Sequence, residues 1–305
     1  MESVTNVATE YGGYMGDYIV RVTAAQGTVR AFAATTTEMV GQASEIHGLS
    51  PIATAALGRT LTAAGMMSKM LKGEKDKLTI QIKGDGPLGG IVVASDSKAN
   101  VRGYVHNPNV YLPLNERGKL DIRTAMGEGY INVIKDMGLK EPYVGLSQLV
   151  SGEIADDLTY YFATSEQVPS TVALGVLIDS SGVTSAGGFI IQMMPGAEEE
   201  TVATLEKRLI GFPPISKLIS EGTTPEEILN MLLEGMNPKI VETVPCNFKC
   251  NCSRERMERN LISIGKNDLL EILEDGKGAE LQCHFCNTKY NFSHQDIENI
   301  IKENA

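Results

Sequence analysis

The chain has 305 residues, of which 42% are hydrophobic and 6% aromatic, and its formal net charge is −11. A chain of this length exceeds one average domain, so we expect two or three domains. The acidic balance argues against a nucleic-acid-binding protein, because such proteins carry basic patches. No stretch approaches about 18 uninterrupted apolar residues, so we expect no membrane-spanning helix.

The amino-terminal segment "MESVTNVATEYGGYMGDY" is polar, and its first positive charge is Arg21. A secretory signal has a basic start followed by an apolar run, and this segment has neither. We therefore expect a cytoplasmic protein, in which thiols stay reduced.

Residues 1–195 show the patterns of a mixed α/β (α+β) core. "DYIVRVTAAQGTVRAFAAT" contains two alternating runs, which predict a β-hairpin over 18–33. In "LSPIATAALGRTLTAAGMMSKMLKG" the spacing predicts a helix with Ser50 as N-cap and Pro51 in its first turn, closing at Gly73. "KLTIQIK", "GGIVVAS" and "NVRGYVH" then predict three strands. "TYYFATSEQ" predicts a helix, and "TVALGVLID" and "AGGFIIQMMP" predict two more strands.

Beyond Gly196 the pattern changes to amphipathic helices, which we expect at 197–210 and 224–236. The second begins with Thr224 and Glu227 in capping-box order. "GMNP" then interrupts the chain just before the cysteines. The predicted organisation is therefore an α/β core over 1–195, a helical connector over 196–237, and a small metal-binding domain over 238–305.

The core contains no convincing catalytic motif. "GDGPLG" at 84–89 has the glycine spacing of a dinucleotide fingerprint, but that motif requires a helix to follow, and "GIVVAS" predicts a strand instead. We interpret it as a β-turn. His47 and His106 stand alone, and residues 165–167 are explained by helix-end capping. We expect a protein that is not an enzyme.

All five cysteines lie between residues 246 and 286. A C-x-C pair and a C-x-x-C pair, separated by 30 residues, can supply four thiolates to the tetrahedral corners that Zn²⁺ prefers. The predicted ligands of one zinc ion per chain are Cys250, Cys252, Cys283 and Cys286. A domain of 68 residues has a modest core, so metal binding should support its fold. Oxidation of the same thiols would remove the ligands.

Two other functions are compatible with such a site. A zinc ribbon could bind nucleic acid, although the net charge of −11 opposes it. Cys283 and Cys286 could act in a thiol oxidoreductase, but such motifs open a helix within a βαβ unit, and "QCHFCNTKYNF" predicts a knuckle between short strands.

The chain resembles the redox-regulated 33-kilodalton heat-shock chaperones of bacteria. The resemblance runs from about Asp17 to the carboxyl terminus, and the most specific part is "CNCSRERMERNL" together with "LQCHFCNTKYNF". Upstream segments that match are "SPIATAALGRTLTA", "IQIKGDGPLGGI", "VRGYV", "YYFATSEQVPS" and "AGGFIIQMMPGA".

The resemblance implies an ATP-independent holdase that is inactive while reduced and zinc-bound. Oxidation together with heat would form the disulfides Cys250–Cys252 and Cys283–Cys286, release zinc, unfold the carboxyl-terminal domain and loosen the connector. Apolar surface would then bind unfolding client proteins, and the activated form would be a homodimer. Cys246 departs from the family pattern and could capture Cys250 or Cys252 instead, which leaves the disulfide pairing open. His284 could replace a ligand in principle, but four matching thiolates disfavour it.

Overall fold

The computed structural model describes residues 16–303 and divides into two compact units, the first ending at Lys249 and the second beginning at Cys250. This boundary differs from the one predicted between residues 237 and 238. Residues 239–245 and 247–248 form strands that pair with the strands Tyr18–Ala24 and Asn100–Val105 of the first unit, so backbone hydrogen bonds hold them there. The helices predicted as a separate connector also belong to the first unit.

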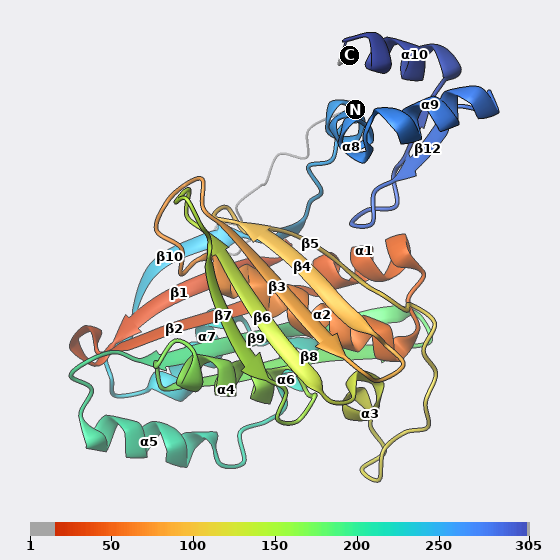
Figure 1. Ribbon diagram of the computed structural model, residues 1–305. Helices are drawn as coiled ribbons and strands as arrows, with labels where there is room; N and C mark the ends of the chain where they lie inside the picture. The colour runs from red at the N-terminus through yellow and green to blue at the C-terminus, as the bar shows by residue number, and fades with distance from the viewer. Residues whose placement is uncertain (1–15, 304–305) are drawn as a thin grey trace. The chain divides into compact units, whose positions relative to one another are not determined.

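The first unit contains two β-sheets (Figure 1). Sheet A has the strand order β10 (Lys239–Pro245), β1 (Tyr18–Ala24), β2 (Val29–Thr35), β9 (Gly182–Met193), β8 (Ser170–Asp179). Sheet B has the order β11 (Asn247–Phe248), β5 (Asn100–Val105), β4 (Gly90–Asp96), β3 (Lys77–Gly84), β6 (Gly129–Asp136), β7 (Tyr143–Gln148). Every strand pair in these two sheets is antiparallel except β11–β5. The predicted hairpin is confirmed, because β1 pairs with β2 across the short η1 turn (Ala25–Gly27).

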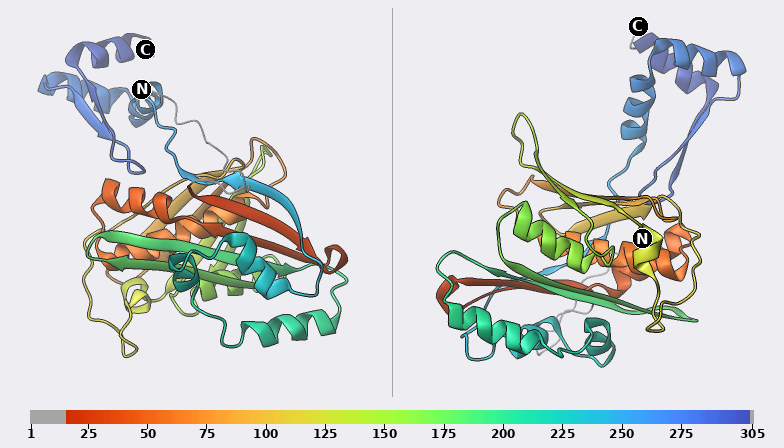
Figure 2. Two further views of the ribbon diagram at one scale, coloured as in Figure 1. Left: turned by 180° about the vertical axis from the view of Figure 1, so that it is seen from behind. Right: turned by 60° about the horizontal axis from the view of Figure 1, so that its bottom comes forward.

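Helix α2 (Pro51–Ser68) lies between the two sheets, as the layers in Figure 2 show. It packs against strands of both sheets, and 16 of its 18 residues are buried. The Ser50 hydroxyl caps it by accepting the backbone N–H of Ala53, as predicted, but the helix ends at Ser68 rather than near Gly73. Small residues let its neighbours approach: a Cβ on Gly58 would lie 2.6 Å from a methyl carbon of Val40.

Three further helices of the first unit lie before residue 195: α1 (Thr37–His47), α3 (Ile122–Met126) and α4 (Ala155–Thr164). Helix α4 confirms the helix predicted from "TYYFATSEQ", with Ser165 as its C-cap. The structure also confirms the five other predicted strands, which are β3, β4, β5, β8 and β9. The sequence had not indicated β6, β7, β10, β11, α1, α3 and α6.

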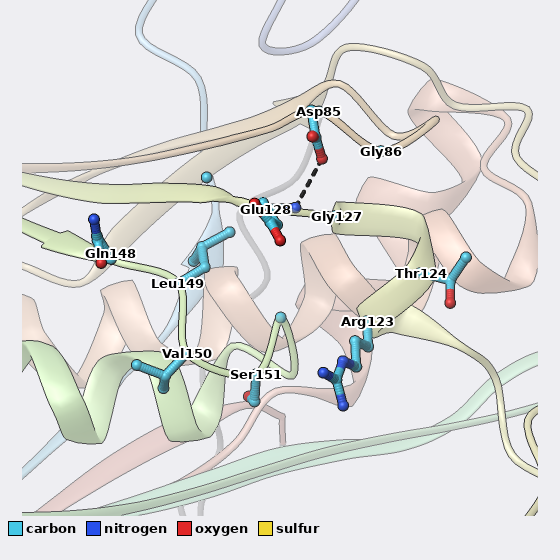
Figure 3. A pocket seen from close by; sticks show the side chains of 12 residues that line it. Asp85, Gly86, Arg123, Thr124, Gly127, Glu128, Gln148, Leu149, Val150 and Ser151 are labelled. Carbon is cyan, nitrogen blue, oxygen red and sulfur yellow. Dashed lines mark hydrogen bonds between the residues drawn. The ribbon is translucent and has the colours of Figure 1, made fainter.

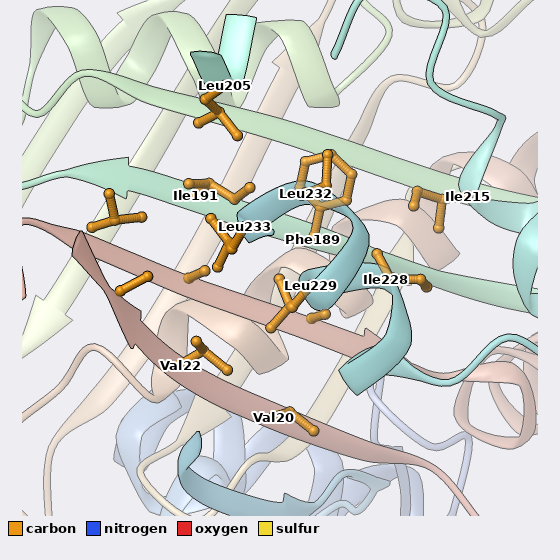
Figure 4. Packing of buried hydrophobic residues seen from close by; sticks show 14 of the residues in the cluster. Val20, Val22, Phe189, Ile191, Leu205, Ile215, Ile228, Leu229, Leu232 and Leu233 are labelled. Carbon is orange, nitrogen blue, oxygen red and sulfur yellow. The ribbon is translucent and has the colours of Figure 1, made fainter. Parts of the chain in front are cut away.

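The predicted amphipathic helices cover the face of sheet A opposite α2. They are α5 (Glu199–Leu209) and α7 (Pro225–Leu233), with the short α6 (Ile215–Ser220) between them. The Thr224–Glu227 capping box that begins α7 is present. Figure 4 shows their apolar side chains packed onto the sheet. The cluster includes Val20, Val22, Phe189, Ile191, Leu205, Ile215, Ile228, Leu229, Leu232 and Leu233.

The glycine-rich segment 84–89 forms the turn between antiparallel strands β3 and β4, as predicted, and no helix follows it. Gly84 is required by a close approach, because a Cβ there would lie 1.9 Å from the Met126 carbonyl oxygen. A polar hollow of about 750 Å³ borders this turn, and the Asp85 carboxylate in its wall accepts the backbone N–H of Glu128 at 2.7 Å (Figure 3).

The second unit consists of three helices and one hairpin. Its elements are α8 (Arg254–Ile264), α9 (Lys266–Asp275), β12 (Ala279–Gln282), β13 (Lys289–Phe292) and α10 (His294–Glu303). They enclose a small core that contains Met257, Leu261, Leu269, Cys283, Phe292, Ile297 and Ile300. Among the residues that the structure describes, no helix is long and apolar enough to cross a membrane.

Asp17 directly precedes β1, and its buried carboxylate caps the first turn of α1. It is 8% exposed and accepts the backbone N–H of Met39 at 2.6 Å. Burial raises the pKa of Asp17 from 3.8 to about 6, against the opposing effect of the backbone hydrogen bonds. The folded protein therefore binds a proton here more tightly than the unfolded chain does. The resulting stabilisation is fully present below about pH 3.8 and is lost as the pH rises through about 6.

Replacing Asp17 by Asn should remove this titration. As the pH falls from 7 to 4, the wild-type free energy of unfolding should gain on the order of 2–3 kcal/mol relative to Asp17→Asn. Denaturant unfolding of both full-length proteins across this pH range, followed by circular dichroism, measures the difference. A difference that does not vary with pH would contradict the raised pKa.

Candidate metal centre

Cys283 and Cys286 lie in the turn between β12 and β13. The Cys283 backbone N–H donates to the Thr288 carbonyl at 2.9 Å, and the Asn287 N–H donates to the Cys283 carbonyl at 2.8 Å. Asn287 has φ +57°, in the left-handed region that closes such a turn. The C-x-x-C pair is thus held as a knuckle within a hairpin, as the sequence predicted.

Cys250 and Cys252 lie on the irregular segment before α8. The Ser253 hydroxyl caps this helix by accepting the Arg256 N–H at 3.3 Å. Arg254 then ties the start of α8 to the hairpin: its guanidinium donates to the Asn291 carbonyl at 2.7 Å and lies 4.4 Å from the centre of the Phe292 ring. These contacts hold the C-x-C pair opposite the knuckle.

The four sulfur atoms of Cys250, Cys252, Cys283 and Cys286 lie within 4.8 Å of one another. The Cys250–Cys283 sulfur separation is 3.7 Å, and that of Cys252–Cys286 is 3.4 Å. A tetrahedron with metal–sulfur bonds of about 2.3 Å has edges of about 3.8 Å, so these separations fit a tetrahedral thiolate site. Within residues 16–303 this is the one group of three or more potential ligands that gathers in this way, and it contains no histidine.

Polar groups beside the sulfurs distinguish the four thiols. Burial raises the pKa of Cys250 and of Cys283. Burial also acts on Cys286, but hydrogen bonds led by those of Thr288 outweigh it and lower the pKa of this thiol to about 7. The Tyr290 hydroxyl donates to the Cys252 sulfur at 3.1 Å. Such donors stabilise negative sulfur and orient it, as the outer partners of metal ligands do.

Two basic side chains near the thiolates are paired with carboxylates. Lys289 pairs with Glu280 at 2.9 Å, and Arg254 pairs with Asp296 at 3.0 Å. The contacts from Thr288 and Tyr290 were missed. Their only signal in the sequence is that both residues follow the C-x-x-C pair within the same hairpin.

Cys246 does not join the cluster. It belongs to the first unit, is 1% exposed, and its sulfur lies 3.7 Å from that of Met39. Its backbone N–H donates to the Asp17 carbonyl at 2.9 Å. Burial, with a smaller contribution from the Asp17 carboxylate, raises the pKa of the Cys246 thiol. This thiol is therefore protonated and covered while the first unit is folded.

The family model for the Hsp33 protein matches residues 17–293. The chain belongs to the Hsp33 family.

Relatives within the Hsp33 family carry the name 33 kDa chaperonin, which is the name of a chaperone and not of an enzyme. One from Ruminiclostridium cellulolyticum is 91% identical over 95% of this chain and 100% of its own length. One from Acetivibrio thermocellus is 58% identical over 94% of this chain and 98% of its own length. The crystal structure of the 33 kDa chaperonin from Thermotoga maritima superposes with a TM-score of 0.89 at 40% identity, covering 95% of this chain and 99% of the other.

The four clustered cysteines should each be needed for metal retention by this Hsp33 chain. Serine at any one of these positions removes a thiolate from a tetrahedral set, so the purified reduced protein should hold clearly less than one zinc per chain. Elemental analysis of the reduced wild type and the four variants measures the metal content.

Cys246→Ser is the matched control, because it removes a thiol that lies four residues before the cluster but in the core of the first unit. It should leave the zinc content unchanged. Equal zinc loss in Cys246→Ser and in the cluster variants would overturn the assignment of the four ligands.

Proposed function

We propose that this Hsp33-family chain is a redox-regulated holdase, which binds unfolding proteins without ATP and is inactive while reduced and metal-bound. The observation that carries the proposal is that the sulfur cluster is part of the core of the second unit. Cys283 is a buried member of that core, and Cys250, Cys252 and Cys286 pack against it. Loss of the ligands therefore removes the metal and part of the core together.

The metal we propose is one Zn²⁺ per chain. Four thiolates form a soft donor set that favours zinc over calcium or magnesium, and the sulfur separations suit its tetrahedral preference. When bound, zinc neutralises much of the charge of the four thiolates and cross-links the segment before α8 to the hairpin. In small domains of this kind metal binding contributes on the order of 10–16 kcal/mol to folding.

Oxidation by peroxide would convert these thiolates to disulfides. For each disulfide, two thiolates give up two electrons, and the peroxide takes up those electrons with two protons and leaves as two water molecules. We propose the pairing Cys250–Cys252 and Cys283–Cys286. Once the second unit unfolds, the two thiols of each pair stay close together along the chain, whereas about 30 residues separate the two pairs. Cys246 competes only if its buried segment also detaches.

The helices α5 to α7 would then be the second part of the switch. They cover the apolar face of sheet A, and α7 is tied to β1 by the Tyr18 hydroxyl, which donates to Glu226 at 2.8 Å. Between α7 and Cys250 the chain runs through β10, whose Glu242 pairs with Lys69 at 3.0 Å. Loosening this segment would release the helices and expose the sheet face to clients.

The proposed partners are unfolded or partly folded proteins, with a homodimer as the activated form and the cytoplasm as the location. A net charge of −11 favours protein clients over nucleic acid. The cluster geometry also disfavours a thiol oxidoreductase, because the C-x-x-C pair lies in a hairpin turn and not at the start of a helix, where the helix dipole would activate a thiol.

Oxidation should switch on client binding and release zinc in the same time course. The reduced, zinc-loaded chain is treated with hydrogen peroxide at raised temperature. A chromophoric chelator reports zinc, mass spectrometry maps the disulfides, and light scattering of a heat-denatured client reports aggregation. Suppression of aggregation should appear only after zinc release. Full suppression by the reduced, zinc-loaded protein would contradict the proposed switch.

The docked helices should set the threshold for activation. Leu205 is 4% exposed and Leu229 1% exposed in the cluster over sheet A. Burial of a leucine stabilises by roughly 1.5–3 kcal/mol, so a charge at either position should undock its helix. We expect Leu205→Glu and Leu229→Glu to suppress client aggregation while reduced and zinc-loaded, as measured by light scattering.

Met231→Glu provides the control, since Met231 lies on the same helix as Leu229 but is 46% exposed. It should keep the oxidant threshold of the wild type. If the two leucine variants also stay inactive until oxidised, the helices are a passive cover and the thiols act by another route.

A further inference from the structure

Strand β7 is the last strand of sheet B and has one open edge. It pairs with β6 on one side, and Figure 1 shows it at the end of the sheet opposite β5. Within residues 16–303 no strand pairs with the other edge of β7, and no backbone hydrogen bond outside the sheet involves residues 143–148. Alternate backbone N–H and C=O groups along this edge are therefore available for a partner.

The residues of β7 carry none of the usual protection of an edge strand. The stretch "YVGLSQLV" from Tyr143 to Val150 contains no charged residue and no proline. Its outward-facing Val144 and Leu146 are 53% and 62% exposed, and Val150 is 51% exposed. Soluble proteins normally guard such edges with lysine, proline, bulges or very short strands, because an open apolar edge attracts another chain.

Two of the three other sheet edges of the first unit are protected. Strand β10 carries Lys239, Glu242 and Pro245, and β11 has only two residues. On β8, whose residues 170–178 include no charge and no proline, the backbone N–H of Val172 donates to the Thr159 hydroxyl of α4 at 3.2 Å. The open edge of β7 is therefore not shared by β10 and β11.

The open edge is also held firmly in place. Gly145 of β7 packs so closely on α4 that a Cβ there would lie 2.7 Å from both the Tyr161 hydroxyl and the Ser165 hydroxyl. The Tyr143 hydroxyl donates to the Ser165 carbonyl at 3.4 Å. A strand fixed by its inner face presents its edge without first having to become ordered, which favours binding.

We propose that β7 binds an extended apolar segment of an unfolded protein as an added strand. This inference rests on the proposed function, for which it specifies one contact. An unpaired strand edge is satisfied by another extended backbone whatever its sequence, which suits a protein that must accept many clients. Val144 and Leu146 favour apolar side chains at alternate positions of the added strand. The six residues of β7 span about 20 Å, enough for a segment of similar length.

The test uses the oxidised full-length chain and a fluorescent eight-residue peptide in which valine alternates with threonine. Leu146→Lys places a charge beside the added strand and should weaken peptide binding about tenfold or more. Val144→Lys should act in the same direction and provides a second variant if the first folds poorly. Leu114→Lys is the matched control, since Leu114 is 60% exposed and lies outside both sheets, and it should bind within about twofold of the wild type.

Amide hydrogen exchange separates strand addition from contact through side chains alone. Peptide binding should slow exchange within residues 143–148, because added-strand hydrogen bonds protect these amides. Peptide binding that leaves their exchange unchanged, or that Leu146→Lys and Val144→Lys do not weaken, overturns this inference and leaves the proposed function standing. Protection of β7 by a second copy of the chain, with no competition by the peptide, also overturns it. If the oxidised wild type suppresses aggregation but does not bind the peptide, this inference is overturned and the proposed function stands. Failure of the oxidised wild type to suppress aggregation removes both.

Discussion

The apolar face of sheet A requires a cover, and the organisation of the first unit depends on how that cover is made. It consists of α5, α6 and α7, with 11, 6 and 9 residues, which are too short to be stable helices by themselves. These helices are therefore ordered because they dock onto sheet A. The chain enters the cover from β9 and leaves it into β10, both strands of the same sheet, so the cover and the sheet it protects stabilise each other.

The second unit is stabilised in a different way. Its core is small, and the sulfur atoms are part of it rather than an addition at its surface. In the proposed switch, oxidation of the thiols would therefore act directly on residues of this core. In the same switch, residues 239–249 connect the sulfur cluster to the helices that cover sheet A. Strand pairing and the buried Cys246 hold these residues to the first unit. Under this proposal, a local change at four thiols would reach a sheet face far along the chain.

The proposed client contacts have complementary chemistry. The face under α5 to α7 offers side chains such as Phe189, Ile191 and Val22, which bind apolar groups through desolvation. The edge of β7 offers backbone hydrogen bonds, which do not depend on the side chains of the client. A holdase must retain chains of unrelated sequence, and the use of both kinds of contact would meet that need.

Features that depend on neighbours along the chain could be predicted from the sequence alone. Each of these features is indicated by a pattern of a few consecutive residues. They are the hairpin of β1 and β2, the Ser50 cap, the Thr224–Glu227 capping box and the two cysteine pairs. Four other features are visible only in the folded protein. Residues 239–245 and 247–248 join the sheets, Cys246 is buried, Tyr290 contacts Cys252, and within residues 16–303 no strand pairs with the outer edge of β7. Each of these depends on which distant segments become neighbours. Strand pairing and packing decide that, and local periodicity does not record it.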